Sequence, residues 1–582
     1  MKHILFFLSI SSTFLLQATN ISYEVSMPEP HTHYYEIKMS VQGYDKEYFD
    51  IQMPTWSPGS YLIREYSKNV EKLTAIFNKK LLKIEKLNKN TWRIYSQKAE
   101  NVNISYKVYA FEMSVRTSFL DASHGYFNGT SMFMLINDLK NTPHELTIIP
   151  YKDWKKVSTS LPKTADKGFH YLASDYDILV DCPVEIGNHE TFDFMAAGVL
   201  HHVAIYGKGN YDIEKLKVDM AKVTQGCTDV FGFNPNQEYT FIIHNLTTGS
   251  GGLEHLSSTT LQVNRWTYSE SQYKGFLSLV AHEYFHLWNV KRIRPIELGP
   301  FDYTKENYTS LLWVMEGFTS YYDDLVLFRT GYYTEDEFIK KVTGSINNIE
   351  NQPGNKVQCA SESSFDAWIK AYSPNENSYN TTISYYSKGN VIANILDLMI
   401  IDATKEEKSL DNVMQYLYHE YYEKQKRGFT MKEMQGALEK ISGLKLNDFF
   451  EKYINGTQTF DYSTIFGYAG LTVQTIVNND AGLGISTKGN IISRVNRNSS
   501  AYEGGLNVND EILAINGFRV NGNVDDFIES KNVGDEISIL LSRDNLIQTI
   551  SFPLKEKGYT LYFITNDSEK RNSIYQKWLS QK

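Results

Sequence analysis

The chain has 582 residues, of which 42% are hydrophobic and 14% aromatic, so it is long enough for three or four domains with full cores. These fractions exclude a disordered protein. Lys and Arg number 58 against 68 Asp and Glu, which gives a net charge of −10, and no stretch forms a basic domain. Nucleic acid is therefore not an expected partner.

Residues 1–18 are expected to be a secretory signal peptide. Residues 1–3 form a basic start, and the apolar run from Ile4 to Leu16 that follows is too short to span a bilayer comfortably. We expect cleavage near Ala18, and a retained anchor is the alternative. The frequent Asn, Lys, Tyr and Ile suggest a bacterial source. The prediction is an exported protein, periplasmic or secreted, with no membrane span after removal of the signal.

The rest of the chain divides by its hydrophobic pattern into three domains and a tail. Residues 19–185 alternate polar and apolar side chains, which predicts a β-rich domain, a sandwich. Residues 186–457 begin as a mixed sheet with one helix and a strand near 239–244, and then become helical. Short strands resume in a domain at 458–560, and a short polar tail follows at 561–582. The helices are expected at 213–230, 274–290, 309–329, 335–348, 387–403, 410–421, 430–441 and 446–453.

The most informative stretch is the H-E-x-x-H motif at 282–286. His282 and His286 are four residues apart, so on a helix they share one face and can bind one Zn²⁺. Glu283 lies beside the first ligand and can reach a water on the ion. The alternative is an ordinary helix with two half-buried histidines. We expect the motif in mid-helix, because the residues before it form an amphipathic helix that buries Phe276, Leu277 and Val280.

A hydrolytic zinc site has three protein ligands and an open position for water. Glu316 is the expected third ligand, because it is a lone acid among apolar residues at 311–318 and would be costly to bury unpaired. A solvent-facing Glu316 and the rival ligand Glu306 are the alternatives. Zinc lowers the pKa of a bound water, and Glu283 is placed to act as the general base. These residues predict a zinc hydrolase, a peptidase, with one Zn²⁺ per chain.

Several motifs resemble a known family. H-E-x-x-H followed by E-G-F-T-x-Y-Y at 316–322 resembles the gluzincin peptidases. The stretches 54–61, 181–187, 288–295 and 298–303 resemble the glycyl aminopeptidase family, across nearly the whole mature chain. The resemblance implies a multidomain α+β fold: an N-terminal β-sandwich-like domain, a thermolysin-like, mostly helical catalytic domain and a C-terminal PDZ-like domain. It also implies an aminopeptidase that prefers glycine or alanine as the first residue.

The resemblance implies roles for two further residues of the catalytic domain. The Y-x-K-G setting at 386–389 implies that Tyr386, rather than Tyr385, donates to the oxyanion of the transition state. Asp323 lies seven residues past Glu316, where relatives of aminopeptidase N also have an acid. The resemblance implies that Asp323 orients a ligand histidine; the alternative is that it is a solvated acid on the helix surface.

The glycine-rich stretch 249–255 resembles the G-x-M-E-N strand of aminopeptidase N relatives. Glu254 then takes the place that binds the substrate's α-ammonium group, while Gly251 and Gly252 let the substrate backbone approach. Leu253 and His255 depart from the pattern, which leaves the details of recognition open. An exposed acid in a glycine-rich loop is the alternative.

Residues 481–517 resemble a PDZ domain, with a G-L-G loop, a short helix with A-x-x-G-G-L and a D-x-I-x-x-I-N-G strand. The backbone of Gly482, Leu483 and Gly484 is the candidate site for a peptide C-terminal carboxylate. A β domain that only packs on the catalytic part is the alternative.

The sequence leaves two points open: whether the three cysteines form a disulfide, and which of several functions the chain has. Cys182, Cys227 and Cys359 have no metal-binding spacing and are expected to be buried hydrophobes, although one bridge is conceivable. The leading hypothesis is a zinc aminopeptidase that acts on peptides. A zinc endopeptidase that recruits peptide C-termini through the PDZ-like domain and a non-catalytic peptide-binding protein are the alternatives.

Overall fold

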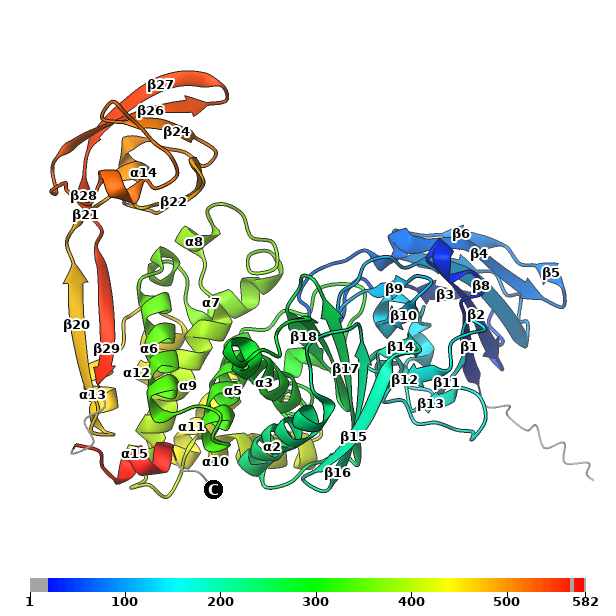
Figure 1. Cartoon of the computed structure of the whole chain (residues 1–582). Helices are drawn as coiled ribbons and strands as arrows, with labels where there is room; N and C mark the ends of the chain where they lie inside the picture. Colours follow the sequence, from blue (N-terminus) through cyan, green and yellow to red (C-terminus); the bar gives the residue numbers. More distant parts are fainter. Residues whose placement is uncertain (1–18, 566–569, 580–582) are drawn as a thin grey trace, which may run out of the picture. The chain divides into compact units, whose positions relative to one another are not determined.

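The computed structural model describes residues 19–565 and 570–579, so the predicted signal peptide lies outside the described residues. The chain forms two compact units. The first comprises Met1–Thr55 and Glu65–Asn188, and the second comprises Trp56–Arg64 and His189–Lys582. The predicted multidomain α+β class is confirmed: a β-rich N-terminal part, a largely helical middle and a strand-rich C-terminal part (Figure 1).

The first unit is built from three sheets, and the long strands of the largest sheet alternate buried and more exposed side chains. Buried positions such as Ile37, Tyr106 and Phe127 form its core. The largest sheet has the order β13 (His170–Ala173), β11 (His144–Ile149), β1 (Asn20–Ser26), β2 (Tyr34–Gln42), β8 (Asn101–Tyr109), β4 (Val70–Phe77), β5 (Lys80–Leu81). The others are β12 (Lys156–Ser158), β14 (Val184–Gly187), β10 (His124–Phe127), β9 (Ser118–Leu120), and β3 (Phe49–Gln52), β7 (Thr91–Ile94), β6 (Ile84–Lys86).

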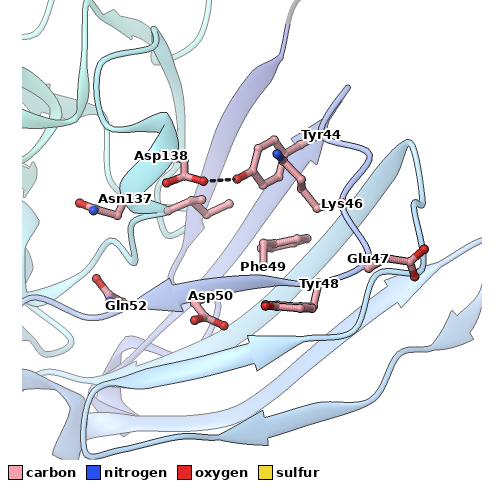
Figure 2. Close-up of a pocket in the computed structure, with 10 residues that line it drawn as sticks. Tyr44, Lys46, Glu47, Tyr48, Phe49, Asp50, Gln52, Asn137 and Asp138 are labelled. Carbon is pink, nitrogen blue, oxygen red and sulfur yellow. Dashed lines mark hydrogen bonds between the residues drawn. The ribbon is translucent and has the colours of Figure 1, made fainter.

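This unit also carries a short helix, α1 (Tyr176–Val180), and a surface pocket of about 470 Å³. Figure 2 shows the pocket, where the Tyr44 hydroxyl donates to Asp138 at 2.9 Å and Phe49 forms part of the lining. Among the described residues, none of those that could jointly hold a metal ion lines this pocket.

The second unit begins with a mixed five-stranded sheet, as the sequence predicts. Its order is β15 (Glu190–Ala196), β16 (Val199–Tyr206), β17 (Glu238–Leu246), β19 (Ser258–Asn264), β18 (Gly251–Glu254). β16, β17 and β19 are parallel, and β18 is an antiparallel edge strand that pairs Gly252 with Leu261. The helix α2 (Ile213–Phe231) packs against β15 and against α3 (Glu270–Phe285). Part of the glycine-rich stretch therefore forms β18, the last strand of this sheet.

The helical part surrounds α3, α5 (Gly317–Arg329) and α9 (Tyr385–Ala403), which pack in that order (Figure 1). Asp397, buried on α9, accepts from Tyr321 of α5 at 2.5 Å. The remaining helices are α4 (Leu312–Met315), α6 (Glu335–Glu350), α7 (Ala360–Phe365), α8 (Ser378–Thr381), α10 (Leu410–Leu417), α11 (Met431–Ser442), α12 (Asn447–Phe449), α13 (Tyr462–Gly467) and α15 (Ser573–Trp578).

Two helices differ from the prediction at functionally important points. The helix expected over 274–290 ends at Phe285, so His286 lies at the helix end rather than in mid-helix. Residues 286–290 continue as turns, and the His286 Nδ1 atom lies 2.6 Å from the Asn289 carbonyl. The helix expected over 309–329 is interrupted at Glu316, between α4 and α5. The periodicity of apolar residues continues through both points, so it could not reveal either change.

The strand-rich C-terminal part has a core of its own, which includes Ile492, Ile512 and Ile539. Its main sheet has the order β22 (Ile485–Lys488), β23 (Ile491–Val495), β24 (Glu511–Ile515), β26 (Glu536–Arg543), β27 (Leu546–Pro553), with β25 (Phe518–Arg519) beside β24 and the helix α14 (Ser500–Gly504) against β27. Two ladders lead into it: β20 (Thr472–Asn478) with β29 (Tyr559–Thr565), and β21 (Ala481–Gly482) with β28 (Lys555–Glu556).

The three cysteines are free, so the bridge left open by the sequence is not formed. Cys182 and Cys227 are buried, as expected of small hydrophobic residues, and Cys359 is half-buried. In the described part of the chain, every helix is too short or too polar to cross a membrane.

Candidate active site

The helix α3 presents His282 and His286 to one point because its opposite face is fixed in the core. Phe276, Leu277 and Val280 are buried, as predicted, and Tyr284 is fully buried. The Tyr284 hydroxyl lies 2.8 Å from His201 Nε2. The two motif imidazoles have centroids 4.7 Å apart and planes at 84°. A helix anchored in this way holds both rings with little freedom to rotate.

Glu316 completes the group at the break between α4 and α5. Its Oε2 atom lies 3.5 Å from His282 Nε2 and 3.2 Å from His286 Nε2. A tetrahedral Zn²⁺ with bonds of about 2.0–2.1 Å would separate its ligand atoms by roughly 3.3 Å. The three side chains therefore fit zinc, with one corner left open. Within the described residues, Glu316 and not the rival Glu306 belongs to a group that could hold a metal ion.

The far side of each imidazole is held by a hydrogen bond. His282 Nδ1 lies 2.9 Å from the Asp323 carboxylate, which also accepts from Ser278 at 3.3 Å. His286 Nδ1 lies 2.6 Å from the Asn289 carbonyl. Because both acceptors require a proton on Nδ1, each ring turns an unprotonated Nε2 toward Glu316 when the imidazole is neutral. This tautomer is the one that binds metal.

Sequence reasoning missed Asn289, which joins the two ligand-bearing segments. Its side-chain amide donates to the carbonyls of Val314 and Met315, each at 3.0 Å, and to the Thr319 hydroxyl at 3.1 Å. The same residue thus orients His286 through its carbonyl and ties the chain after α3 to the Glu316 break. Only the N-V-K-R stretch that follows Trp288 could have drawn attention to it.

Two glycines bring α9 close to the Glu316 break. A Cβ atom on Gly317 would lie 2.3 Å from the Gly389 Cα, and a Cβ on Gly389 would lie 2.1 Å from the Trp313 carbonyl oxygen. Neither position can hold a side chain without moving the two helices apart. The close approach places Tyr386 beside the ligands, with its ring 6.1 Å from the His282 ring and 24° from parallel. The adjacent Tyr385 is buried behind it, 1% exposed.

The edge strand β18 brings a second acid to the site. Glu254 is 4% exposed, and its carboxylate lies within 4.8 Å of ligand atoms on Glu283 and His286. The Gly252 backbone lies directly against Glu283, because a Cβ atom there would be 2.4 Å from the Glu283 carboxyl carbon. Gly251, at the start of the strand, has a φ of +114°, which favours glycine.

Burial and nearby charges perturb the titrating groups of this cluster. Burial raises the pKa of the Glu283 carboxyl to about 7, against the lowering effect of the two imidazoles. Burial would also raise the pKa of Glu316, but the His286 imidazole and the hydrogen bond with His282 lower it to about 2. Burial opposes protonation of His282, yet the Asp323 hydrogen bond raises its pKa overall. Three buried carboxylates around two imidazoles thus create a potential that favours a bound cation.

Glu283 has the environment expected of a proton acceptor. It is 5% exposed, and its Oε2 atom has no hydrogen-bond partner among the described residues. A buried carboxylate oxygen without a partner is costly unless a water or substrate group pairs with it. This orphaned oxygen, beside a ligand group that fits zinc, distinguishes Glu283 from a structural acid.

The predicted carboxylate loop of the PDZ domain and the buried Arg292 lie outside this cluster. The loop Gly482–Gly484 precedes β22, the last strand of its sheet. Two of its carbonyls accept hydrogen bonds from α14: Leu483 from Ala501 N at 3.0 Å and Gly482 from the Ser500 hydroxyl at 2.6 Å. Arg292 is buried and donates to the Leu287 carbonyl at 2.6 Å and to Asn236 at 2.6 Å, so it braces the backbone after α3.

Comparison with known protein families gives three matches along the chain. Residues 22–188 match the Peptidase M61 N-terminal domain, residues 275–392 match the M61 glycyl aminopeptidase family, and residues 464–540 match the PDZ domain. No curated protein sequence matches the chain.

Solved structures agree with these matches. An aminopeptidase N family protein from Idiomarina loihiensis is 30% identical, with a TM-score of 0.89 over 96% of this chain and 100% of that one. An M1 zinc metallopeptidase from Deinococcus radiodurans is 12% identical, with a TM-score of 0.50 over 76% of this chain and 94% of that one. The second likeness is one of fold alone.

Fold and side-chain cluster together define a zinc metallopeptidase that acts as an aminopeptidase. The chain belongs to the M61 glycyl aminopeptidase family, as the sequence motifs indicated. The PDZ domain expected from residues 481–517 is likewise confirmed.

Proposed function

We propose that this aminopeptidase removes small first residues, glycine or alanine, from peptides, and that Glu254 binds the free amino terminus. The buried Glu254 carboxylate beside the ligand group is the observation that carries the proposal. A buried acid needs a cationic or hydrogen-bonding partner, and the substrate's α-ammonium group supplies one. When the ammonium group is bound to Glu254, the peptide bond after the first residue reaches the metal site.

The ligand set is one Zn²⁺ on His282, His286 and Glu316. Bound zinc polarises the scissile carbonyl and acidifies the attacking water. Glu283 takes the proton from that water and passes it to the leaving amine, a role supported by its unpaired Oε2 atom and its pKa near 7. Tyr386 donates a hydrogen bond to the oxygen on which charge develops.

Asp323 and the Asn289 carbonyl keep the imidazoles in the ligating tautomer. Both act through the histidines and touch no substrate. Gly251 and Gly252 lie on β18, the last strand of its sheet, and because they have no side chains the substrate backbone can approach the site closely.

A screen of aminoacyl amides against the zinc-loaded enzyme tests the proposal. The wild type should cleave glycyl and alanyl substrates best, and chelation followed by zinc addition should remove and restore the activity. Glu254→Ala should lose activity selectively on free-amine substrates. N-acetylation of the substrate should abolish cleavage by the wild type. Cleavage of acetylated peptides at internal bonds would instead favour the endopeptidase alternative.

We also propose that the PDZ domain binds the C-terminal carboxylate of a peptide at Gly482–Gly484. Support comes from β22, which is the last strand of its sheet among the described residues, and from the Gly482 and Leu483 carbonyls, which accept from α14. A peptide could add to β22 as a strand while backbone N–H groups bind its carboxylate. Fluorescence anisotropy with peptides that end in a carboxylate or an amide tests this: only the carboxylate form should bind.

Export to the periplasm or medium remains a proposal that rests on residues 1–18. Mass spectrometry of the protein from fractionated cells tests it. The expected result is a processed chain that begins close to residue 19, outside the cytoplasm.

A further inference from the structure

The segment Trp56–Arg64 has no role in the proposed function, although its sequence motif is part of the family resemblance. Residues before and after it belong to the first unit, but the segment itself belongs to the second. It forms a tight turn in which Ser60 N donates to the Ser57 carbonyl at 3.0 Å. Gly59, within the turn, has a φ of +85°, which a residue with a side chain rarely adopts.

Aromatic side chains of the helical part hold this turn in place. The Trp56 indole N–H donates to the Asp302 carbonyl at 2.8 Å, and its ring packs on Trp368 with centroids 5.1 Å apart. The Tyr61 ring also packs on Trp368, with centroids 5.6 Å apart. The Tyr372 hydroxyl donates to the Gly59 carbonyl at 3.4 Å. With both ends of the turn fixed by buried aromatic rings, it is a rigid part of the catalytic unit.

The tip of the turn lies against the proposed amine-binding acid. A Cβ atom on Gly59 would be 2.5 Å from Glu254 Oε1, and its three nearest atoms would all belong to the Glu254 carboxylate. The Gly59 backbone therefore covers one side of this carboxylate. No peptide could extend in that direction past a group bound to Glu254.

A small cavity opens beside the same carboxylate. It measures about 20 Å³, and its lining combines Trp56, Gly59, Tyr61, Leu298 and Phe301 with the charged residues Glu254, Lys291 and Arg294. A cavity needs about 10–15 Å³ by this measure to hold one water molecule. The space is therefore sufficient for a hydrogen or a methyl group and too small for a branched or aromatic side chain.

We propose that the turn Ser57–Ser60 is the closed end of the substrate groove and that the cavity it walls is the pocket for the first side chain. This inference rests on the proposed function, because it takes Glu254 as the group that holds the ammonium. Gly59 then has two effects. It stops the peptide one residue beyond the metal site, and with Leu298 and Phe301 it restricts the first residue to glycine or alanine.

Enlarging the pocket tests the inference. Leu298→Ala and Phe301→Ala, in the full zinc-loaded chain, should raise the ratio of kcat/KM for leucine amide to that for alanine amide by about tenfold or more, since one methylene in such a pocket changes kcat/KM about 10–200-fold. A purely structural role would lower kcat/KM for both substrates alike. An unchanged ratio in both variants would overturn the inference.

A second pair of variants tests the inference independently if the pocket substitutions destabilise the fold. Gly59→Ala should lower kcat/KM for alanine amide about tenfold or more, with zinc content unchanged, because the new methyl group displaces the Glu254 carboxylate. Gly198→Ala is the matched control: its φ is +75°, equally unfavourable, but a Cβ there meets nothing within 4 Å. Equal losses in the two variants would mean that backbone strain alone is responsible, which contradicts the inference.

Glu254→Gln separates this inference from the proposed function. If Glu254→Gln leaves the KM for alanine amide unchanged, the amine-binding role is wrong and the pocket assignment is lost with it. If Glu254→Gln raises KM while the enlarged pockets leave the leucine-to-alanine ratio unchanged, the proposed function stands and only the closed-end pocket is refuted.

Discussion

Removing the charge of Asp323 should weaken zinc binding without disturbing the three ligands. Its carboxylate accepts from His282 Nδ1 at 2.9 Å, and Asp323 is 9% exposed, so solvent screens this bond little. A hydrogen bond to a charged acceptor contributes about 1.5–3 kcal/mol, and a neutral one about 0.5–1.5 kcal/mol. Asp323→Asn keeps an acceptor but loses the charge, which costs about 1–1.5 kcal/mol, or roughly tenfold in zinc affinity. Asp323→Ala loses the whole bond and should cost about 10–100-fold.

The loss of zinc affinity in the two variants can be measured by competition with a chelator of known zinc affinity. The quantity recorded is the amount of bound metal per chain. Asp324→Asn is the neighbouring control, since it makes the same replacement one residue along α5, and its carboxylate pairs with Lys341 at 3.3 Å rather than with an imidazole. Far-ultraviolet circular dichroism checks that each variant is folded. A zinc affinity for Asp323→Ala within about threefold of the wild type would refute the reasoning, because outer hydrogen bonds of metal-bound imidazoles normally matter more than that.

Three further predictions concern the base, the oxyanion donor and the buried core. Glu283→Gln should keep stoichiometric zinc and lower kcat by about 10²–10⁴; loss of the metal together with activity would argue that Glu283 is structural. Tyr386→Phe should lower kcat about 10²–10³ with little change in KM, while Tyr385→Phe should retain activity; similar effects in both would contradict the assignment. Burial lowers the pKa of His201 in the folded protein to about 4. Between about pH 6.5 and pH 4 the unfolded chain binds a proton at His201 and the folded protein does not, so the free energy of unfolding falls as the pH falls through this range. The difference in Tm between wild type and His201→Gln should therefore narrow with acid, and a constant difference would count against a neutral buried imidazole.

Local patterns in the sequence were sufficient to predict the class of fold and a group of side chains that the structure brings together, His282, His286 and Glu316. The spacing of His282 and His286 requires only helical geometry, and an acid within an apolar run, such as Glu316, must find a partner when buried. Alternation of polar and apolar residues similarly predicts strands, because successive side chains point to opposite faces of a sheet. These inferences depend on neighbours within one or two turns of the chain, so the sequence contains them in full.

Contacts between distant segments could be seen only in the tertiary structure. Three such contacts join residues that are far apart in sequence or on separate elements. They are the hydrogen bonds of Asn289, the close approach of Gly317 and Gly389, and the packing of Gly59 on Glu254. No periodicity encodes such a pairing, since it depends on how the elements pack. The sequence alone thus predicted candidate side chains for the chemistry. Only the fold decided which backbone surrounds them and how much room the substrate has.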